Sequence, residues 1–172
     1  TKGDLIDYYT KIAPCILPHL QDRPLVFTRY PDGITGKSFY QKNAPPYRPE
    51  WIETISWTSS GDSTKNLILA GHKADLAWLA NQAVIEIHPW LSRRNSLDYP
   101  DFVVFDLDPS AGSTFEQVVT IAKTIKQILD ELRLKSYLKT SGAEGLHIYV
   151  PVINRFTYAE LRRFSGKIAG MV

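Results

Sequence analysis

Two aspartates past the middle of the chain have the spacing of a shared carboxylate site. Asp106 and Asp108 end the apolar run F-V-V-F-D-L-D at residues 102–108, and Pro109 follows them. Because side chains alternate across a strand, a strand over this run places both carboxylates on one face. A divalent cation with oxygen ligands would relieve their mutual repulsion, which favours Mg²⁺ or Mn²⁺. The alternative is that both side chains simply project into solvent at a strand end.

A glycine-bounded turn later in the chain carries groups that bind phosphate. Residues 141–147, S-G-A-E-G-L-H, combine backbone N–H groups, the Ser141 hydroxyl and the His147 imidazole. An ordinary hairpin turn followed by a strand histidine has the same pattern. A single crossover helix between the aspartate strand and this turn would bring the two together at one edge of a sheet.

A third region mixes basic and aromatic side chains. Residues 29–51 contain Arg29, Lys37, Lys42, Arg48, Tyr30, Phe39, Tyr40, Tyr47 and Trp51. Cations that contact phosphates and rings that stack on bases favour nucleic-acid binding, although the same residue types are enriched at protein interfaces. His88 ends an alternating segment and is either a strand-end histidine or a nucleotide contact. His19 and His72 are predicted to be structural.

Length and composition predict one packed domain over residues 1–172. The chain is 44% hydrophobic and 22% charged, which excludes disordered, collagen-like and rod-like classes. Its net charge of +2 does not by itself predict a nucleic-acid partner. With no long apolar run and no signal-peptide pattern, we expect a soluble intracellular protein without a membrane partner. We expect the only cysteine, Cys15, to be buried in a reducing compartment.

Hydrophobic periodicity and turn residues predict the elements that position these groups. In the first half we expect a helix over 4–20 that Pro14 and Pro18 shorten, a strand over 24–30, an exposed loop over 37–51, strands near 52–58 and 66–70, a helix over 75–83 and a strand over 83–88. After a loop over 90–100 we expect strands over 102–108, 136–140 and 146–152, a helix of about five turns opened by a capping box at Ser113 and Glu116, and a helix over 158–168. The fold class is therefore α/β (α+β), with a mixed, largely antiparallel sheet and flanking helices.

Six segments carry a family resemblance. They are T-K-G-D-L-I-D-Y-Y, R-Y-P-D-G, S-F-Y-Q-K, I-E-I-H-P-W, V-F-D-L-D-P and K-T-S-G-A-E-G-L-H-I-Y-V-P. In this order they resemble the polymerase domain of ligase D, a member of the archaeo-eukaryotic primase superfamily that acts in prokaryotic non-homologous end joining. The resemblance runs over nearly the whole chain.

The resemblance implies a primase-polymerase-like core and a metal-dependent nucleotidyltransferase that fills gaps at DNA breaks, often with ribonucleotides and manganese. It implies that Asp106 and Asp108 are catalytic and hold two Mn²⁺ or Mg²⁺ ions. The nucleotide-binding residues that it implies are Arg29, Lys42, His88, Ser141, Gly142, Gly145 and His147. Phe39 and Tyr40 would form a platform on a template base, and Lys2 would contact the DNA 5′-phosphate.

The chain also departs from the family pattern. Relatives usually carry a third metal-binding aspartate after the Ser-Gly turn, whereas Asp130, inside the predicted long helix, is the only aspartate here that follows Asp108. Thr28 and Glu144 stand where basic residues are common. We therefore expect an incomplete copy of the domain that lacks its C-terminal part, and weak or no synthesis by these 172 residues.

Other classes of protein remain as alternatives. A non-catalytic module that binds DNA ends or nucleotides would keep the same surface. A haloacid-dehalogenase-type phosphatase or a glycosyltransferase also uses Asp-x-Asp, but Pro109 and Ser110 replace the usual Gly-Thr of the former. For the polymerase, the expected partners are gapped DNA or DNA ends with a 5′-phosphate, NTP or dNTP, Ku and a ligase module, in the prokaryotic cytoplasm.

Overall fold

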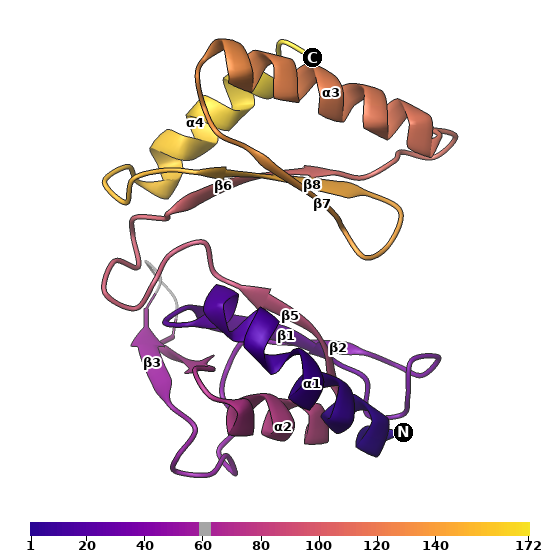
Figure 1. The fold of residues 1–172 in the computed structure, drawn as a ribbon. Helices are drawn as coiled ribbons and strands as arrows, with labels where there is room; N and C mark the ends of the chain where they lie inside the picture. Colours follow the sequence, from indigo (N-terminus) through magenta and orange to yellow (C-terminus); the bar gives the residue numbers. More distant parts are fainter. Residues whose placement is uncertain (59–62) are drawn as a thin grey trace. The chain divides into compact units, whose positions relative to one another are not determined.

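The computed structural model describes residues 1–58 and 63–172, which form two compact units, Thr1–Asn95 and Ser96–Val172 (Figure 1). Each unit has an antiparallel sheet, helices on one face of that sheet and a hydrophobic core of its own. The predicted α+β class with antiparallel sheets and flanking helices is confirmed, with two sheets in place of one. The single domain expected over 1–172 stays a prediction.

Among its described residues, the first unit holds two helices and five strands. They are α1 (Lys2–Leu20), β1 (Pro24–Arg29), β2 (Phe39–Gln41), β3 (Thr54–Trp57), β4 (Lys65–Leu69), α2 (Lys73–Asn81) and β5 (Val84–Pro89). Strand β1 pairs with β2, β4 and β5, and β3 pairs with β4. The two helices pack side by side over one face, where Leu25, Phe27 and Ile68 are buried with Leu76 and Leu79 (Figure 1).

The prediction of a short first helix is wrong, because α1 continues for 19 residues through Pro14 and Pro18. Each proline removes one helical hydrogen bond, but tertiary packing holds the helix together. The Tyr9 hydroxyl donates to the carbonyl oxygens of Val84 (3.2 Å) and Ile85 (3.1 Å). Tyr9, Ala13 and Leu20 are buried.

Two smaller expectations in the first unit are also wrong. Cys15 is exposed rather than buried. It lies about 200° around the helix from the buried Ala13, since each residue turns the helix by about 100°. The segment 37–51 is not all loop, because Phe39–Gln41 pairs with β1 as a short strand.

Strand register defines a second face of this sheet, which points away from α1 and α2. Alternation along β1 places Leu25 and Phe27 toward the helices, and so Val26 and Thr28 toward the opposite side. Paired positions on neighbouring strands share a side. We call this side the open face, and its residues include Val26, Thr28, Tyr40, Trp57, Lys65, Leu67, Glu86 and His88.

The second unit is a three-stranded sheet with two helices on one face (Figure 1). Its elements are β6 (Phe102–Leu107), α3 (Phe115–Glu131), β7 (Tyr137–Thr140), β8 (Leu146–Pro151) and α4 (Tyr158–Ala169). The strand order is β6-β8-β7, and both pairings are antiparallel. The core between sheet and helices includes Val103, Phe105, Ile148, Ile125 and Leu129.

Helix α3 has the predicted length of about five turns, but its capping box lies one residue later than predicted. Thr114, in extended conformation, accepts from the Gln117 backbone N–H (3.4 Å), and the Gln117 side chain accepts from the Thr114 N–H (2.9 Å). Ser113 instead shares a hydrogen bond with the Ser110 hydroxyl (2.7 Å). Among the described helices, none is long and apolar enough to cross a membrane.

Candidate active site

Asp106 on β6 and His147 on β8 are direct neighbours across the second sheet. The strand register pairs them, and His147 Nε2 lies 2.9 Å from Asp106 Oδ1. The Asp106 side chain is 61% exposed, so its carboxylate remains open to solvent and ligands. His147 Nδ1 is buried and has no hydrogen-bond partner among the described residues. The imidazole is therefore anchored through the nitrogen that contacts the carboxylate.

Asp108 lies just beyond the end of β6, against the turn that leads into β8. Gly145 is buried there, and a Cβ at that position would overlap the Asp108 carboxylate and the Leu107 carbonyl oxygen. Only glycine fits this approach without displacing one of them. The structure thus brings the aspartate strand and the glycine turn together at one end of the sheet.

The turn from Ser141 to Gly145 is held by its own hydrogen bonds. The Ser141 backbone N–H donates to the Gly145 carbonyl (2.9 Å), and Ser141 Oγ accepts from the N–H groups of Ala143 (3.2 Å) and Gly145 (3.0 Å). Gly142 has a positive φ of 100°. Three backbone N–H groups that could have bound a phosphate, those of Ser141, Ala143 and Gly145, are thus engaged within the turn. The Ser141 hydroxyl hydrogen stays available as a donor.

The donor set suits a hard divalent cation. Two carboxylates at a strand end supply oxygen ligands and leave coordination positions for water and for substrate phosphates, which is how proteins bind Mg²⁺ and Mn²⁺. In the part of the chain that the structure describes, no group of three or more His, Cys, Asp or Glu side chains could hold a metal. The candidate metal ligands among the described residues are therefore the two carboxylates of Asp106 and Asp108.

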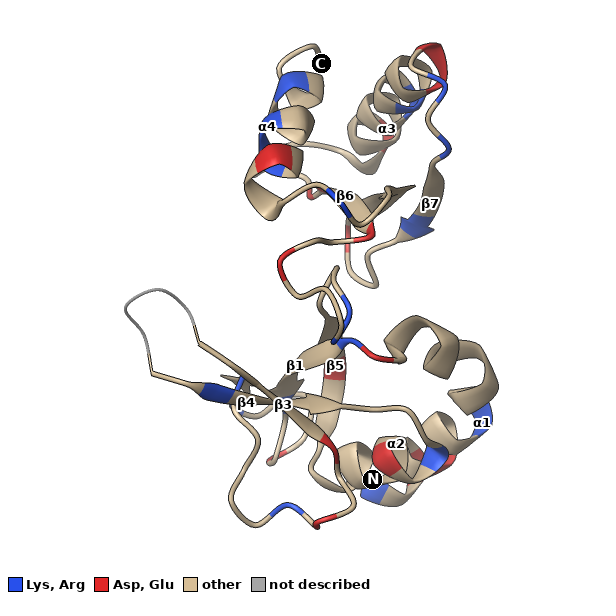
Figure 2. Cartoon of the chain, turned by 90° about the vertical axis from the view of Figure 1, so that its left-hand side faces the viewer, with Lys and Arg blue, Asp and Glu red and all other residues tan. Residues whose placement is uncertain are grey.

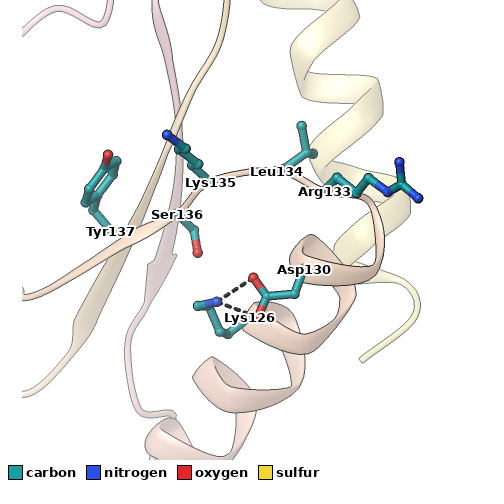
Figure 3. Close-up of a pocket in the computed structure, with 7 residues that line it drawn as sticks. All are labelled: Lys126, Asp130, Arg133, Leu134, Lys135, Ser136 and Tyr137. Atoms are coloured by element: carbon teal, nitrogen blue, oxygen red, sulfur yellow. Dashed lines mark hydrogen bonds and ion pairs between the residues drawn. The ribbon is translucent and has the colours of Figure 1, made fainter.

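Asp130 does not supply a third carboxylate. It lies near the end of α3 and pairs with Lys126 one turn earlier (Figure 3). Both residues line a surface cavity of about 430 Å³ at the end of the helix, together with Arg133, Leu134, Lys135, Ser136 and Tyr137. None of the predicted site residues lines this cavity.

His88 lies within a polar cluster on the open face of the first sheet. Its Nε2 is 3.3 Å from Thr28 Oγ1 and 3.5 Å from Glu86 Oε2. The Tyr30 hydroxyl donates to Glu86 Oε1 at 2.5 Å. Hydrogen bonds from Tyr30 and Thr28 hold the pKa of Glu86 below its ordinary value, and the bond to Glu86 raises the pKa of Tyr30. The Tyr40 ring packs beside the imidazole at 5.6 Å.

Arg29 and Phe39 lie on the other side of the same sheet. Arg29 donates to the Gln82 carbonyl (2.7 Å), to Gln41 Oε1 (3.1 Å) and to the Tyr47 hydroxyl (3.0 Å), and its guanidinium packs over the Phe39 ring. Successive strand residues face opposite sides, so Phe39 and Tyr40 do not form one platform. Of the residues predicted to contact nucleotide or DNA, Arg29 and Phe39 thus lie on one face of the sheet, and His88 and Tyr40 lie on the other.

The remaining predicted residues are exposed. Lys2 opens α1, and Lys42 follows β2 with its Nζ 5.7 Å from the centre of the Tyr40 ring. Lys and Arg occur on both units (Figure 2).

The sequence analysis missed a groove of about 370 Å³ on the open face. Its lining adds Trp57, Lys65 and Trp90 to the predicted Tyr40 and Lys42, over Val26 and Leu67. The alternation of β3 and β4 could have placed Trp57 and Lys65 on one side. Only their register against β1, which the sequence does not reveal, puts them beside Tyr40.

Antiparallel sheets with helices on one face, and an aspartate pair beside a glycine turn, fit a domain of the primase-polymerase class. The chain matches the family "LigD, primase-polymerase domain" over residues 1–172 and belongs to this family. This confirms the resemblance and removes the phosphatase and glycosyltransferase alternatives. The family acts in non-homologous end joining.

Curated relatives agree with this assignment. The chain is 36% identical over 154 residues to the multifunctional non-homologous end joining protein LigD of Mycolicibacterium smegmatis, covering 88% of this chain and 20% of that protein. It is 34% identical over 171 residues to the bifunctional LigD of Bacillus subtilis, covering 98% and 27%. The chain thus spans about a fifth to a quarter of these relatives.

A solved structure shares the fold. The polymerase domain of Mycobacterium tuberculosis ligase D, in complex with DNA, superimposes with a TM-score of 0.91 at 27% sequence identity. The match covers 99% of this chain and 62% of that one.

Proposed function

We propose that this chain is the catalytic part of a DNA-end-binding, metal-dependent nucleotidyltransferase that fills gaps during non-homologous end joining. The observation that carries the proposal is the Asp106 and Asp108 pair beside the Ser141–Gly145 turn. Carboxylates next to a phosphate-binding turn are the groups that phosphoryl transfer requires, because catalysis there is mainly positioning and charge stabilisation.

Asp106 and Asp108 would hold Mn²⁺ or Mg²⁺, which supplies charge stabilisation for the transferred phosphate and makes the primer 3′-hydroxyl more acidic. His147 would orient Asp106 through the 2.9 Å contact of its Nε2, and it is also a proposed contact of the triphosphate. Ser141 donates its hydroxyl hydrogen to a phosphate oxygen. Gly142, exposed on the turn, would let the backbone approach the phosphates without a side chain in between, and Gly145 would let the turn pack directly against Asp108.

The first unit would bind the remaining parts of the substrates. His88 and Lys42, on or next to the open face, and Arg29, on the opposite side, are proposed nucleotide contacts. Tyr40 would stack on a template base. Phe39, the other residue proposed to contact DNA, lies on the opposite face of the same strand. Lys2, exposed at the start of α1, would bind the 5′-phosphate across a gap.

The proposed partners are gapped DNA or DNA ends with a 5′-phosphate, together with NTP or dNTP, in the bacterial cytoplasm. The DNA in the mycobacterial polymerase-domain complex supports DNA as a partner. Ku and a ligase module are proposed from the family's part in end joining.

The experiment is template-dependent extension of a gapped, 5′-phosphorylated duplex with Mn²⁺ and either NTPs or dNTPs. Asp106→Ala and Asp108→Ala should each abolish incorporation, whereas the matched control Asp130→Asn should retain it because Asp130 pairs with Lys126 instead. Synthesis that survives in both variants would overturn the proposal.

A second candidate is a DNA-end-binding module that does not synthesise. It is favoured by the metal site, which gathers two carboxylates rather than three among the described residues. The 172-residue chain would then bind gapped DNA and extend no primer. Extension by this chain at a rate that depends on Asp106 would remove this candidate.

A further inference from the structure

We propose that the groove lined by Tyr40, Trp57, Trp90, Lys42 and Lys65 binds an unpaired base of single-stranded DNA. The proposal rests on the proposed function, because it assumes that the chain binds DNA. All of the residues that line the groove belong to the first unit. Three of the five residues, Trp57, Lys65 and Trp90, have no role in the function proposed above.

The strand register brings these residues together from four strands. Tyr40 pairs with Thr28, and Trp57 pairs with Lys65 across β3 and β4. Trp90 follows β5, where its backbone N–H donates to the Pro24 carbonyl (2.9 Å). Residues that are distant in the chain therefore line one cavity on the open face.

The groove has an apolar floor and aromatic walls. Val26 and Leu67 are 6% and 1% exposed, although they lie on the side away from α1 and α2. The rings of Trp57 and Trp90 meet edge to face, with centroids 5.1 Å apart and planes at 84°, so each ring limits the motion of the other. The volume of about 370 Å³ is within the usual range of ligand pockets, about 300–1,000 Å³.

The charge of the lining favours a nucleic acid over other flat ligands. Lys42 and Lys65 line the groove, and none of the described residues that line it is acidic. Aromatic rings that stack on bases, combined with cations that contact the backbone, are the standard means of binding single strands without sequence preference. Paired bases cannot enter such a groove, because their faces are already stacked. The occupant is therefore a base outside the duplex, as in an overhang or a gap.

The test places 2-aminopurine, a fluorescent base that is quenched by stacking, at successive positions of a single-stranded overhang. With the 172-residue chain we expect quenching at one or two adjacent positions. Trp57→Ala should relieve it and weaken overhang binding about five-fold or more, the lower limit for a stacked base. Trp57→Phe should keep part of the quenching. Trp51→Ala is the matched control, because Trp51 is exposed and lies outside the groove.

Lys65→Ala provides a second test that keeps the three aromatic side chains of the groove. It should weaken overhang binding and reduce its salt dependence, whereas Lys37→Ala, outside the groove, should weaken it less. Circular dichroism checks the fold of each variant. If Trp57→Ala unfolds, Trp57→Phe and Lys65→Ala decide the question.

The outcomes separate this proposal from the proposed function. If the wild-type chain binds overhang DNA and all groove variants bind and quench like the wild type, only the groove proposal fails. If a groove variant loses affinity for blunt duplex and overhang equally, the groove is not a single-strand site. If the wild-type chain binds no DNA, both proposals fail. Asp130→Asn should leave the quenching unchanged, because Asp130 pairs with Lys126 and does not line the groove.

Discussion

The imidazole of His147 and the carboxylate of Asp106 face each other on adjacent antiparallel strands, 2.9 Å apart. The pairing fixes both backbones, so the carboxylate has one oxygen held by a ring nitrogen and the other open to solvent. A group that orients a metal-binding carboxylate stands in this relationship to it, and Asp106 is the proposed metal ligand. It is the basis of the first prediction.

Replacing His147 should weaken metal binding rather than folding. We expect His147→Ala to lower Mn²⁺ affinity about 10- to 100-fold, the usual cost of losing a group that orients a metal ligand, and His147→Gln to restore part of it. Isothermal titration with Mn²⁺ measures this without any turnover. His19→Gln, at the exposed end of α1, is the control. Unchanged affinity in His147→Ala would show that Asp106 needs no such support.

Gly145 should not tolerate a side chain. Gly145→Ala forces a Cβ against the Asp108 carboxylate and the Leu107 carbonyl, so we expect a loss of about 1–3 kcal/mol in the free energy of unfolding. Gly166→Ala is the matched control: its Cβ meets open space within α4, and the change should stabilise by about 0.5–1 kcal/mol. Urea unfolding of both variants measures the difference. Equal stability of Gly145→Ala and the wild type would contradict the close approach.

The Tyr30–Glu86 hydrogen bond should respond to pH at both ends of the scale. The pKa of Glu86 is lowered in the folded chain, so its contribution to stability is present above the pKa of the unfolded chain and is lost as pH falls through the lowered value. The pKa of Tyr30 is raised, so its contribution is lost as pH rises through the raised value. Tyr30→Phe should move the pKa of Glu86 upward, as measured by carbon NMR of the carboxyl group. Glu53 is the control, and a pKa of Glu86 that stays in place in the variant would refute the assignment.

The buried hydroxyl of Tyr9 should stabilise α1 in a pH-dependent way. Burial raises the pKa of Tyr9 to about 12, so its two hydrogen bonds to β5 persist below the ordinary value of 10 and weaken as pH rises toward 12. Tyr9→Phe should cost about 0.5–1.5 kcal/mol at neutral pH. Tyr8→Phe, next to it and exposed, should cost nothing measurable. Chemical unfolding of the pair tests the prediction, and equal losses would contradict it.

Local patterns were enough to predict the aspartate strand, the long helix and the glycine turn. The apolar run before Asp106 and the stripe along α3 have clear periods, and a single crossover helix leaves few ways to connect them. The course of α1 could not be predicted, because tertiary contacts of Tyr9 and Ala13 overcome the local effect of Pro14. The exact cap of α3 depends on backbone angles rather than on residue type, since Ser113 and Thr114 both qualify as caps.

Contacts between strands distant in the chain were beyond sequence reasoning. Trp57 and Trp90 are 33 positions apart and meet only because β4 and β5 both pair with β1. The opposite orientation of Phe39 and Tyr40 follows from strand geometry, but it required knowing that 39–41 is a strand. Register is fixed by which face is buried, and several residues of this sheet are buried on both faces.

The Ser141 turn completes its hydrogen bonds within itself. Its shape is therefore set during folding, before any nucleotide arrives. A triphosphate that binds there would meet a rigid receptor and lose little entropy to loop ordering, so affinity would depend on the few donors still pointing outward. Because all nucleoside triphosphates carry the same phosphates, discrimination among nucleotides would then come from contacts with the base and the sugar.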